Sequence, residues 1–215
     1  MKDIILNELD ILPVNYPELS TCRDDILAAF GLMKDCYLRG GLIMTCGNGG
    51  SAADAGHVVG ELMKGFKQKR RLTDEQREKI KKAFPDKGDF LADNLQQAIP
   101  AISLSDQVAL TSAFINDVSP DMVFAQQVLG YGKEGDVLIG FSTSGNSKNV
   151  VNACRVAASF GVKTIGMTGE SGGVMREVCD LTIRVPATET YRVQEYHLPV
   201  YHTLCAMLEA AFFND

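Results

Sequence analysis

The sequence predicts an α/β fold in which a parallel sheet is covered by helices on both faces. Five short apolar runs occur along the chain, and stretches with helical periodicity lie between most of them. Strands that alternate with helices form parallel sheets, because each helix returns the chain to the start of the next strand. The 215 residues are enough for one domain with a large buried core.

The chain begins with a predicted helical arm over about residues 1–39, in which residues 19–38 carry apolar side chains at helical spacing. Gly40-Gly41 ends this pattern, and the first strand is predicted at 42–44. A long closing helix is predicted at 194–213. The remaining strands are predicted at 99–104, 137–141, 162–167 and 181–185.

Residues 67–98 form a charged insert that breaks the alternation of strands and helices. Thr73 and Gln76 form a capping-box pattern, which predicts a short helix ending near Phe84. Residues 67–82 contain eight Lys or Arg and three Asp or Glu, a local charge of +5 that leaves −11 for the rest of the chain. This pattern favours a solvated helix over a binding patch.

The composition argues against several classes of partner. A net charge of −6 and a pI of about 5.1 do not suit a protein that binds nucleic acid or anionic membranes. No apolar run is long enough to span a membrane, and the N-terminus lacks a signal-peptide pattern. The six cysteines are scattered and form no CxxC pair, which is typical of a reducing compartment. We therefore expect a cytoplasmic protein.

The first motif is CGNGGS at 46–51, directly after the first predicted strand and before a helix that starts near Ala52. Glycines at such a turn let the backbone approach a ligand, and a helix N-terminus favours an anion. Glycine-rich turns also occur for geometric reasons alone. The spacing fits neither the GxGxxG dinucleotide fingerprint nor a P-loop, since no GK[ST] follows.

The second motif is STSGNS at 142–147, between the predicted strand at 137–141 and a helix at 149–160. Its four hydroxyls can surround a phosphate without a lysine, because the helix N-terminus supplies a favourable field. The structural alternative is a Ser N-cap, which accounts for one hydroxyl and not for four. Both motifs fall at the carboxyl edge of the sheet, where open α/β sheets bind ligands.

Three histidines are present, His57, His197 and His202. His57 and Glu61 are four residues apart, so one helix face carries both, as in a metal site, an acid/base pair or a plain surface contact. Gln194 and His202 are eight apart on the closing helix and can converge on one site. Helix geometry alone leaves His197 and His202 as equal candidates.

Five stretches together resemble the SIS (sugar isomerase) family, and within it the phosphoheptose isomerases. They cover nearly the whole chain apart from the N-terminal arm and the insert. The resemblance implies one SIS domain over 1–215, with a five-stranded parallel sheet in a flavodoxin-like three-layer sandwich. It also implies a homotetramer with sites at subunit interfaces. The stretches are CGNGGSAADAGHVVGEL, NDVSPDMVFAQQV, GDVLIGFSTSGNSKNVVNA, MTGESGG and RVQEYHLPVYH.

The resemblance further implies conversion of sedoheptulose 7-phosphate to D-glycero-D-manno-heptose 7-phosphate through an enediol. Glu61 and His202 would be the acid/base pair. One zinc ion would be held by His57, Glu61, Gln194 and His202. The loop and sugar contacts would come from Asn48, Gly49, Gly50, Ser51, Asp117, Ser142, Thr143, Ser144, Ser147 and Gln194.

Two features depart from the family pattern. Tyr191 stands before Arg192 where many heptose isomerases have an acid, and the insert follows the predicted catalytic helix. The alternatives are a non-catalytic scaffold that associates with a replication initiator, and a phosphosugar lyase or deaminase-type isomerase acting on an amino sugar. A transcriptional regulator of this family would need a DNA-binding domain, for which the chain has no room. The presence of both Glu61 and His202 favours the isomerase.

Overall fold

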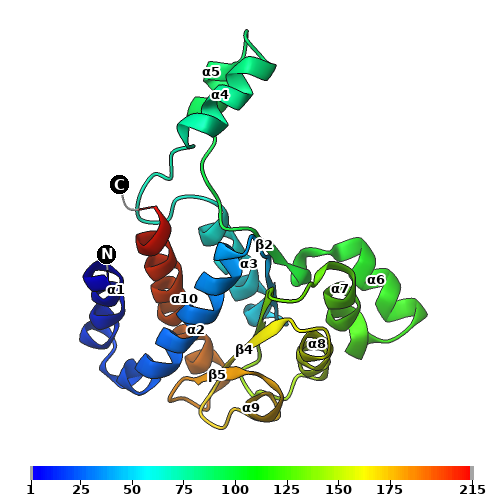
Figure 1. The fold of residues 1–215 in the computed structure, drawn as a ribbon. Coiled ribbons are helices and arrows are strands. Elements are labelled where there is room, and N and C mark those ends of the chain that lie inside the picture. Colours follow the sequence, from blue (N-terminus) through cyan, green and yellow to red (C-terminus); the bar gives the residue numbers. More distant parts are fainter. Residues whose placement is uncertain (1, 214–215) are drawn as a thin grey trace.

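A computed structural model describes residues 2–213 and confirms the predicted α/β architecture (Figure 1). One parallel sheet has the strand order β2-β1-β3-β4-β5. Each strand overlaps one of the five predicted runs. The strands are β1 (Ile43–Cys46), β2 (Ala101–Ser103), β3 (Val137–Phe141), β4 (Lys163–Thr168) and β5 (Leu181–Arg184).

The strand order places a topological switch point between β1 and β3. From β1 the chain crosses to β2 on one side, and it later returns to β3 on the other side. Cys46, the last residue of β1, is in register with Gly140 of β3. The loops after these two strands therefore leave the carboxyl edge of the sheet side by side, at the position where such folds bind ligands.

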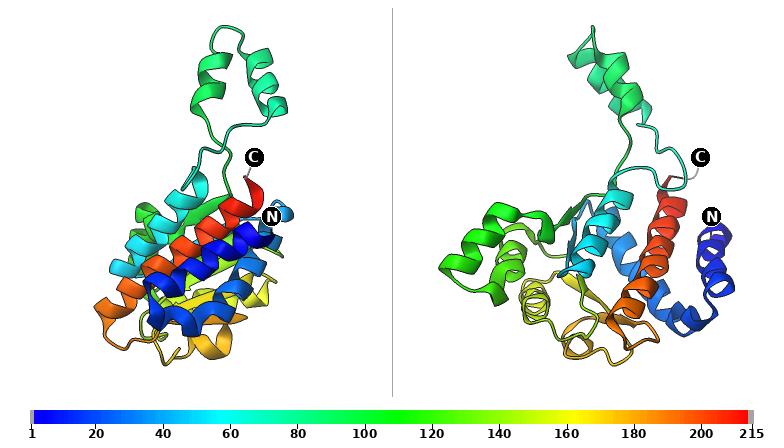
Figure 2. Two further views of the ribbon diagram at one scale, coloured as in Figure 1. Left: turned by 90° about the vertical axis from the view of Figure 1, so that its left-hand side faces the viewer. Right: turned by 180° about the vertical axis from the view of Figure 1, so that it is seen from behind.

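Helices cover both faces of the sheet and form the expected three layers (Figures 1 and 2). Neighbouring strand residues point to opposite faces, so Ile43 belongs to one buried cluster and Met44 to the other. The first face is covered by α2 (Arg23–Leu38), α3 (Gly50–Met63) and α10 (Thr190–Phe212), with α1 (Lys2–Asn15) packed on α10. The second is covered by α7 (Val123–Tyr131), α8 (Lys148–Ser159) and α9 (Met175–Val178).

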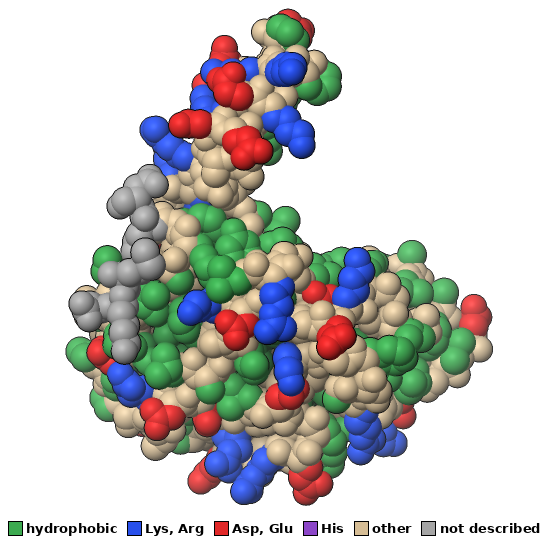
Figure 3. Space-filling view, in the orientation of Figure 1, with side chains coloured by type: hydrophobic (Ala, Val, Ile, Leu, Met, Phe, Trp, Pro, Cys, Tyr) green, Lys and Arg blue, Asp and Glu red, His purple; other side chains and the backbone are tan. Residues whose placement is uncertain are grey.

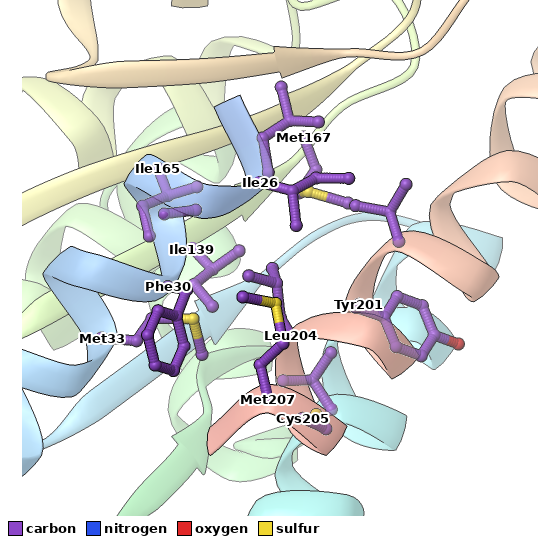
Figure 4. Packing of buried hydrophobic residues seen from close by; sticks show 14 of the residues in the cluster. Ile26, Phe30, Met33, Ile139, Ile165, Met167, Tyr201, Leu204, Cys205 and Met207 are labelled. Atoms are coloured by element: carbon purple, nitrogen blue, oxygen red, sulfur yellow. The ribbon is translucent and has the colours of Figure 1, made fainter. Parts of the chain in front are cut away.

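The larger cluster joins α10 to α2 and to the sheet. Figure 4 shows Leu204 and Met207 of α10 beside Phe30 of α2, with Ile139 of β3 close by. These side chains are at most 7 % exposed. Burial of this size holds α10 in place, because each fully buried aliphatic or aromatic side chain contributes about 1.5–3 kcal/mol.

The N-terminal and C-terminal helices differ in extent from the prediction. Residues 17–22 form a 3₁₀ turn with Pro17 at its start, so the predicted helix at 19–38 begins in this turn and continues as α2. The closing helix begins four residues before the predicted position, at Thr190, and continues past Pro199. An additional helix, α6 (Val108–Asp117), follows a short turn after β2. Within residues 2–213, no helix is both long and apolar enough to cross a membrane.

The insert, residues 67–98, forms a helical hairpin that stands away from the body; we call it the arm (Figure 2). The predicted helix is α4 (Asp74–Ala83), and its capping box is confirmed by Gln76 N–H donating to Thr73 Oγ1 at 3.2 Å and Thr73 N–H donating to Gln76 Oε1 at 2.9 Å. None of the α4 residues is buried, so the helix is solvated in this chain, and its preference over a binding patch stays a prediction. The second helix, α5 (Gly88–Asn94), was not predicted, because seven residues are too few to show a helical period.

Candidate active site

The two predicted loops meet at the switch point. The side chains of Asn48, after β1, and Asn149, in the first turn of α8, exchange two hydrogen bonds of 2.9 Å. Each amide donates to the carbonyl oxygen of the other. The glycine-rich loop and the serine-rich loop are thereby joined into one surface at the carboxyl edge of β1 and β3.

The serine-rich loop presents its hydroxyls without using them as a helix cap. Ser147 is the N-cap residue of α8, yet its side chain makes no capping hydrogen bond. Its hydroxyl instead lies 2.9 Å from the hydroxyl of the buried Ser142. Ser144 is exposed and accepts from the Asn146 N–H at 3.2 Å. The structural alternative, a capping serine, does not describe this loop.

The loop after β1 is shaped by glycine. Gly49 has φ +57°, a left-handed conformation that favours glycine, and it is the N-cap of α3 without a side-chain cap. A Cβ on Gly50 would lie 2.7 Å from Nε2 of Gln194, so the Gln194 amide sits directly against this loop. Ser51 is buried in the first turn of α3. Two uncapped helix N-termini, of α3 and α8, therefore face one edge and can receive an anion.

A second group of predicted residues gathers further along α3 and α10. His57 Nε2 lies 3.3 Å from Glu61 Oε1, which confirms that the two residues share one face of α3. The ring of His202, from α10, lies edge-on to the His57 ring with a centroid distance of 5.0 Å. Lys64 donates to Glu61 Oε2 at 2.8 Å. The structure thus brings His57, Glu61 and His202 together.

The surroundings set the charge state of this group. Burial works to raise the pKa of Glu61, but the hydrogen bond and charge of Lys64, together with His57, outweigh burial and leave the pKa below its usual value. Burial lowers the pKa of His202, the charge of His57 lowers it further, and Glu61 opposes both. At neutral pH the pair is therefore a carboxylate and a neutral imidazole, which are the forms that can accept a proton.

Two members of the cluster were missed by the sequence analysis. The hydroxyl of Tyr201 lies 2.9 Å from His57 Nδ1, and it donates to Asp54 Oδ1 at 3.3 Å. Figure 4 shows the Tyr201 ring at the rim of the apolar cluster with its oxygen pointing outward. Burial raises the pKa of Asp54 despite the Tyr201 hydrogen bond and the nearby His57. For Asp54, the sequence does offer one indication: it lies three residues before His57, and this spacing places both residues on one helix face.

The two candidate histidines of α10 have different surroundings in the structure. His197 is fully buried, and its ring lies edge-on to Phe141 of β3 at 5.8 Å. Burial lowers its pKa to about 4, so it is neutral at physiological pH. His202 is partly exposed and adjoins His57. The histidine of α10 that lies beside His57 and Glu61 is therefore His202.

The match to known sequences decides the family. The family model described as SIS domain matches residues 18–83 and 91–169. This chain belongs to the SIS domain family. The break in the match, residues 84–90, falls at the turn of the arm.

Relatives of this SIS domain are phosphoheptose isomerases. The chain is 39 % identical to the phosphoheptose isomerase of Rhodospirillum rubrum, over 91 % of this chain and 90 % of that protein. It is 33 % identical to the Akkermansia muciniphila protein of the same name over the full length of both. The solved phosphoheptose isomerase GmhA of Neisseria gonorrhoeae superposes with a TM-score of 0.70 at 28 % identity, covering 93 % of this chain and 97 % of that one.

Asp117 and Gln194 lie outside the group that His57, Glu61 and His202 form in this SIS domain. Asp117 is exposed at the end of α6, where it accepts from Asn116 at 2.7 Å, and the described contacts do not join it to the loops. Gln194 lies two turns before His202 on α10, against Gly50. Among residues 2–213, no three His, Cys, Asp or Glu side chains are arranged to hold a metal ion. The nitrogen Nε2 of His202 is buried and has no hydrogen-bond partner among the same residues.

Proposed function

We propose that this SIS domain converts sedoheptulose 7-phosphate to D-glycero-D-manno-heptose 7-phosphate. The observation that carries the proposal is the pairing of α3 with α10. Gln194 contacts Gly50 at the loop, and two turns further along each helix His202 contacts His57. The phosphate would bind at the first contact, and the carbonyl end of the sugar would reach the second, roughly 11 Å away along the helices.

The proposed chemistry is a proton transfer between neighbouring carbons. Isomerisation of a ketose to an aldose removes a proton next to the carbonyl and returns one to the adjoining carbon through an enediol. A carboxylate at Glu61 and a neutral imidazole at His202 suit the two transfers. The Tyr201 hydroxyl and Asp54 would hold the His57 ring in one orientation.

The names of the relatives support this reaction over the alternatives. The relatives at 33–41 % identity that cover most of this chain are phosphoheptose isomerases. The non-catalytic scaffold is therefore not favoured, and neither is an enzyme of amino sugars. Conversion of sedoheptulose 7-phosphate by the purified protein tests the proposal. A protein that is folded and binds the sugar phosphate without converting it would support the scaffold.

We propose in addition that the site holds one zinc ion per chain, with His57, Glu61 and His202 as ligands. Gln194, the fourth expected ligand, would have to turn its amide from Gly50 toward His202 to reach the same ion. The unpartnered Nε2 of His202 and the imidazole and carboxylate chemistry of the set support the proposed ion. When bound, the ion would polarise the substrate carbonyl. We expect metal analysis to find about one equivalent per chain. Full activity in a metal-free, chelator-treated sample would contradict the proposal.

We also infer a homotetramer. Exposed apolar side chains lie along α1 and α6, including Val14 at 77 % and Val108 at 76 % exposure, and green side chains gather over α6 on the right of Figure 3. Apolar surface of this extent usually marks an interface. Light scattering at micromolar concentration would then give about four times the chain mass, and a monomer mass would contradict it.

A cytoplasmic location is proposed from the thiols. All six cysteines are free, and five of them are buried. Free thiols persist in reducing compartments. Fractionation of cells that express the protein at its natural level would test the location.

A further inference from the structure

A buried ion pair lies where α3 ends and the arm begins. Arg70 Nε lies 2.8 Å from Oε1 of Glu209, and the two side chains are 0 % and 2 % exposed. Removing two charges from water is strongly unfavourable unless they are paired and fully hydrogen-bonded. A buried ion pair is weak evidence for added stability, so its role is inferred from the groups that the two side chains contact.

Arg70 closes the last turn of α3. Its Nη1 donates to the Leu62 carbonyl at 2.7 Å and its Nη2 to the Glu61 carbonyl at 3.1 Å. The final carbonyls of a helix have no partner within the helix, and a cation there is favoured by the helix dipole. The guanidinium also lies over the Phe213 ring at 4.7 Å. Arg70 thereby fixes the turn from which the Glu61 side chain projects.

Glu209 fixes the segment that leaves α3. Its carboxylate accepts from the backbone N–H groups of Phe66 at 2.8 Å, Lys67 at 2.6 Å and Gln68 at 3.2 Å. The ring of Phe66 lies against the His202 ring, with a centroid distance of 5.2 Å. Glu209 is also on α10, seven residues after His202. The carboxylate that pairs with Arg70 therefore supports the side of the His202 ring formed by Phe66.

We propose that Arg70 and Glu209 are positioning residues that set His202 relative to Glu61. Neither side chain is accessible to a substrate, so both act through other residues. Arg70 donates to the backbone carbonyl of Glu61. Glu209 binds the backbone N–H of Phe66, whose ring lies against His202. The kinetic part of this inference rests on the proposed isomerase function.

The proposal is tested with Glu209→Gln and Arg70→Lys. The Gln variant keeps the side-chain size and one acceptor oxygen but loses the charge. The Lys variant keeps the charge but has one nitrogen in place of the three that bond Glu209, Leu62 and Glu61. We expect kcat to fall about 10- to 100-fold in each with KM little changed, because small displacements of catalytic groups have effects of this size. Lys81→Met, which breaks the exposed Lys81–Asp89 pair of 2.7 Å on the arm, should leave both constants unchanged.

A spectroscopic measurement separates positioning from stability. The chain has only three histidines, so single substitutions assign their imidazole ¹⁵N signals. In both variants, at temperatures where circular dichroism shows them folded, we expect the His202 and His57 signals to shift and the His197 signal to stay. Lower melting temperatures with unchanged kcat and unchanged His202 signals would overturn the proposal. Should the wild type convert no sugar phosphate, the isomerase function fails, and the imidazole signals still decide the positioning role.

Discussion

The two ends of α3 are completed in opposite ways. At its N-terminus Gly49 supplies no side-chain cap, and Gln194 and the serine-rich loop stand beside it. At its C-terminus the guanidinium of Arg70 occupies the carbonyls of Glu61 and Leu62. One end leaves backbone N–H groups available to an anion, and the other is satisfied from within the protein.

The difference shows how one helix can be fixed at one end and leave its other end free to bind a ligand. His57 and Glu61 lie between the ends, so the closed end fixes their position along the helix, and the proposed phosphate site lies at the open end. The same arrangement explains how an arm follows α3. Arg70 stands at the root of the arm, where its carbonyl accepts from Gln97 N–H at 2.8 Å, and the arm extends outward from this fixed point (Figure 1).

The largest effect is expected between the two ends, at Glu61. Glu61→Gln keeps the size of the side chain and removes its basicity. We expect kcat to fall about 10²- to 10⁴-fold with the fold intact, as is usual for a general acid or base. Metal content is measured in the same samples, because Glu61 is also a proposed ligand. A Gln variant with normal turnover would remove Glu61 from the chemistry.

The two histidines of α10 give the next largest effect. The folded-state pKa of His197, about 4, lies below the unfolded value of 6.5, so the unfolded chain binds more protons between these pH values. The contribution of neutral His197 to the free energy of unfolding is full above about pH 6.5 and is lost as the pH falls toward 4. The loss is about 3 kcal/mol by linkage.

Urea unfolding of wild type and His197→Asn across this pH range measures that contribution. The variant should show the smaller dependence on pH. His202→Asn should instead lower kcat, with the steep pH dependence of stability retained. Normal turnover in His202→Asn together with loss of turnover in His197→Asn would reverse the assignment.

The open end is tested with Ser147→Ala. A hydrogen bond to a charged phosphate contributes about 1.5–3 kcal/mol, so we expect KM to rise by a corresponding factor of about 10 to 100 with kcat less affected. Ser144→Ala serves as a second test on the exposed side of the loop. Calorimetry that finds undiminished phosphosugar binding in both variants would rule out the loop as the phosphate site.

The smallest effect is expected from the charges of the arm. Figure 3 shows side chains of both signs along its surface. Arg77 pairs with Asp93 at 2.6 Å, with both side chains in contact with solvent. Exposed pairs contribute little to stability because solvent screens them, so Arg77→Met should change the melting temperature only slightly. A loss as large as that in Glu209→Gln would mean that the arm is part of the same cooperative unit as the Arg70–Glu209 pair.

Much of the framework could be predicted because its signals are local. The apolar runs give the strands, and Gly40-Gly41 and the two loop motifs mark the turns. Parallel strand order then brings the loops after β1 and β3 to one edge, and the spacing of four places His57 with Glu61.

The remaining contacts join residues that are far apart in the sequence, so a single sequence does not predict them. Arg70 and Glu209 are 139 residues apart, and the insert around Arg70 has the composition of a solvated segment. Tyr201 has the spacing of the buried face of α10, so the sequence alone indicates a core residue there. Asp117 was placed by resemblance, and its position at the end of α6 gives it no described contact with the loops.

The central claim is that this chain moves a proton between neighbouring carbons of a phosphosugar. The direct measurement is NMR of sedoheptulose 7-phosphate incubated in D₂O with the wild type and with Glu61→Gln. The account predicts deuterium at C1 or C2 of the recovered sugars with the wild type and almost none with the variant. Wild-type protein that is folded and metal-loaded, yet exchanges no carbon-bound hydrogen of any tested ketose phosphate, would contradict it.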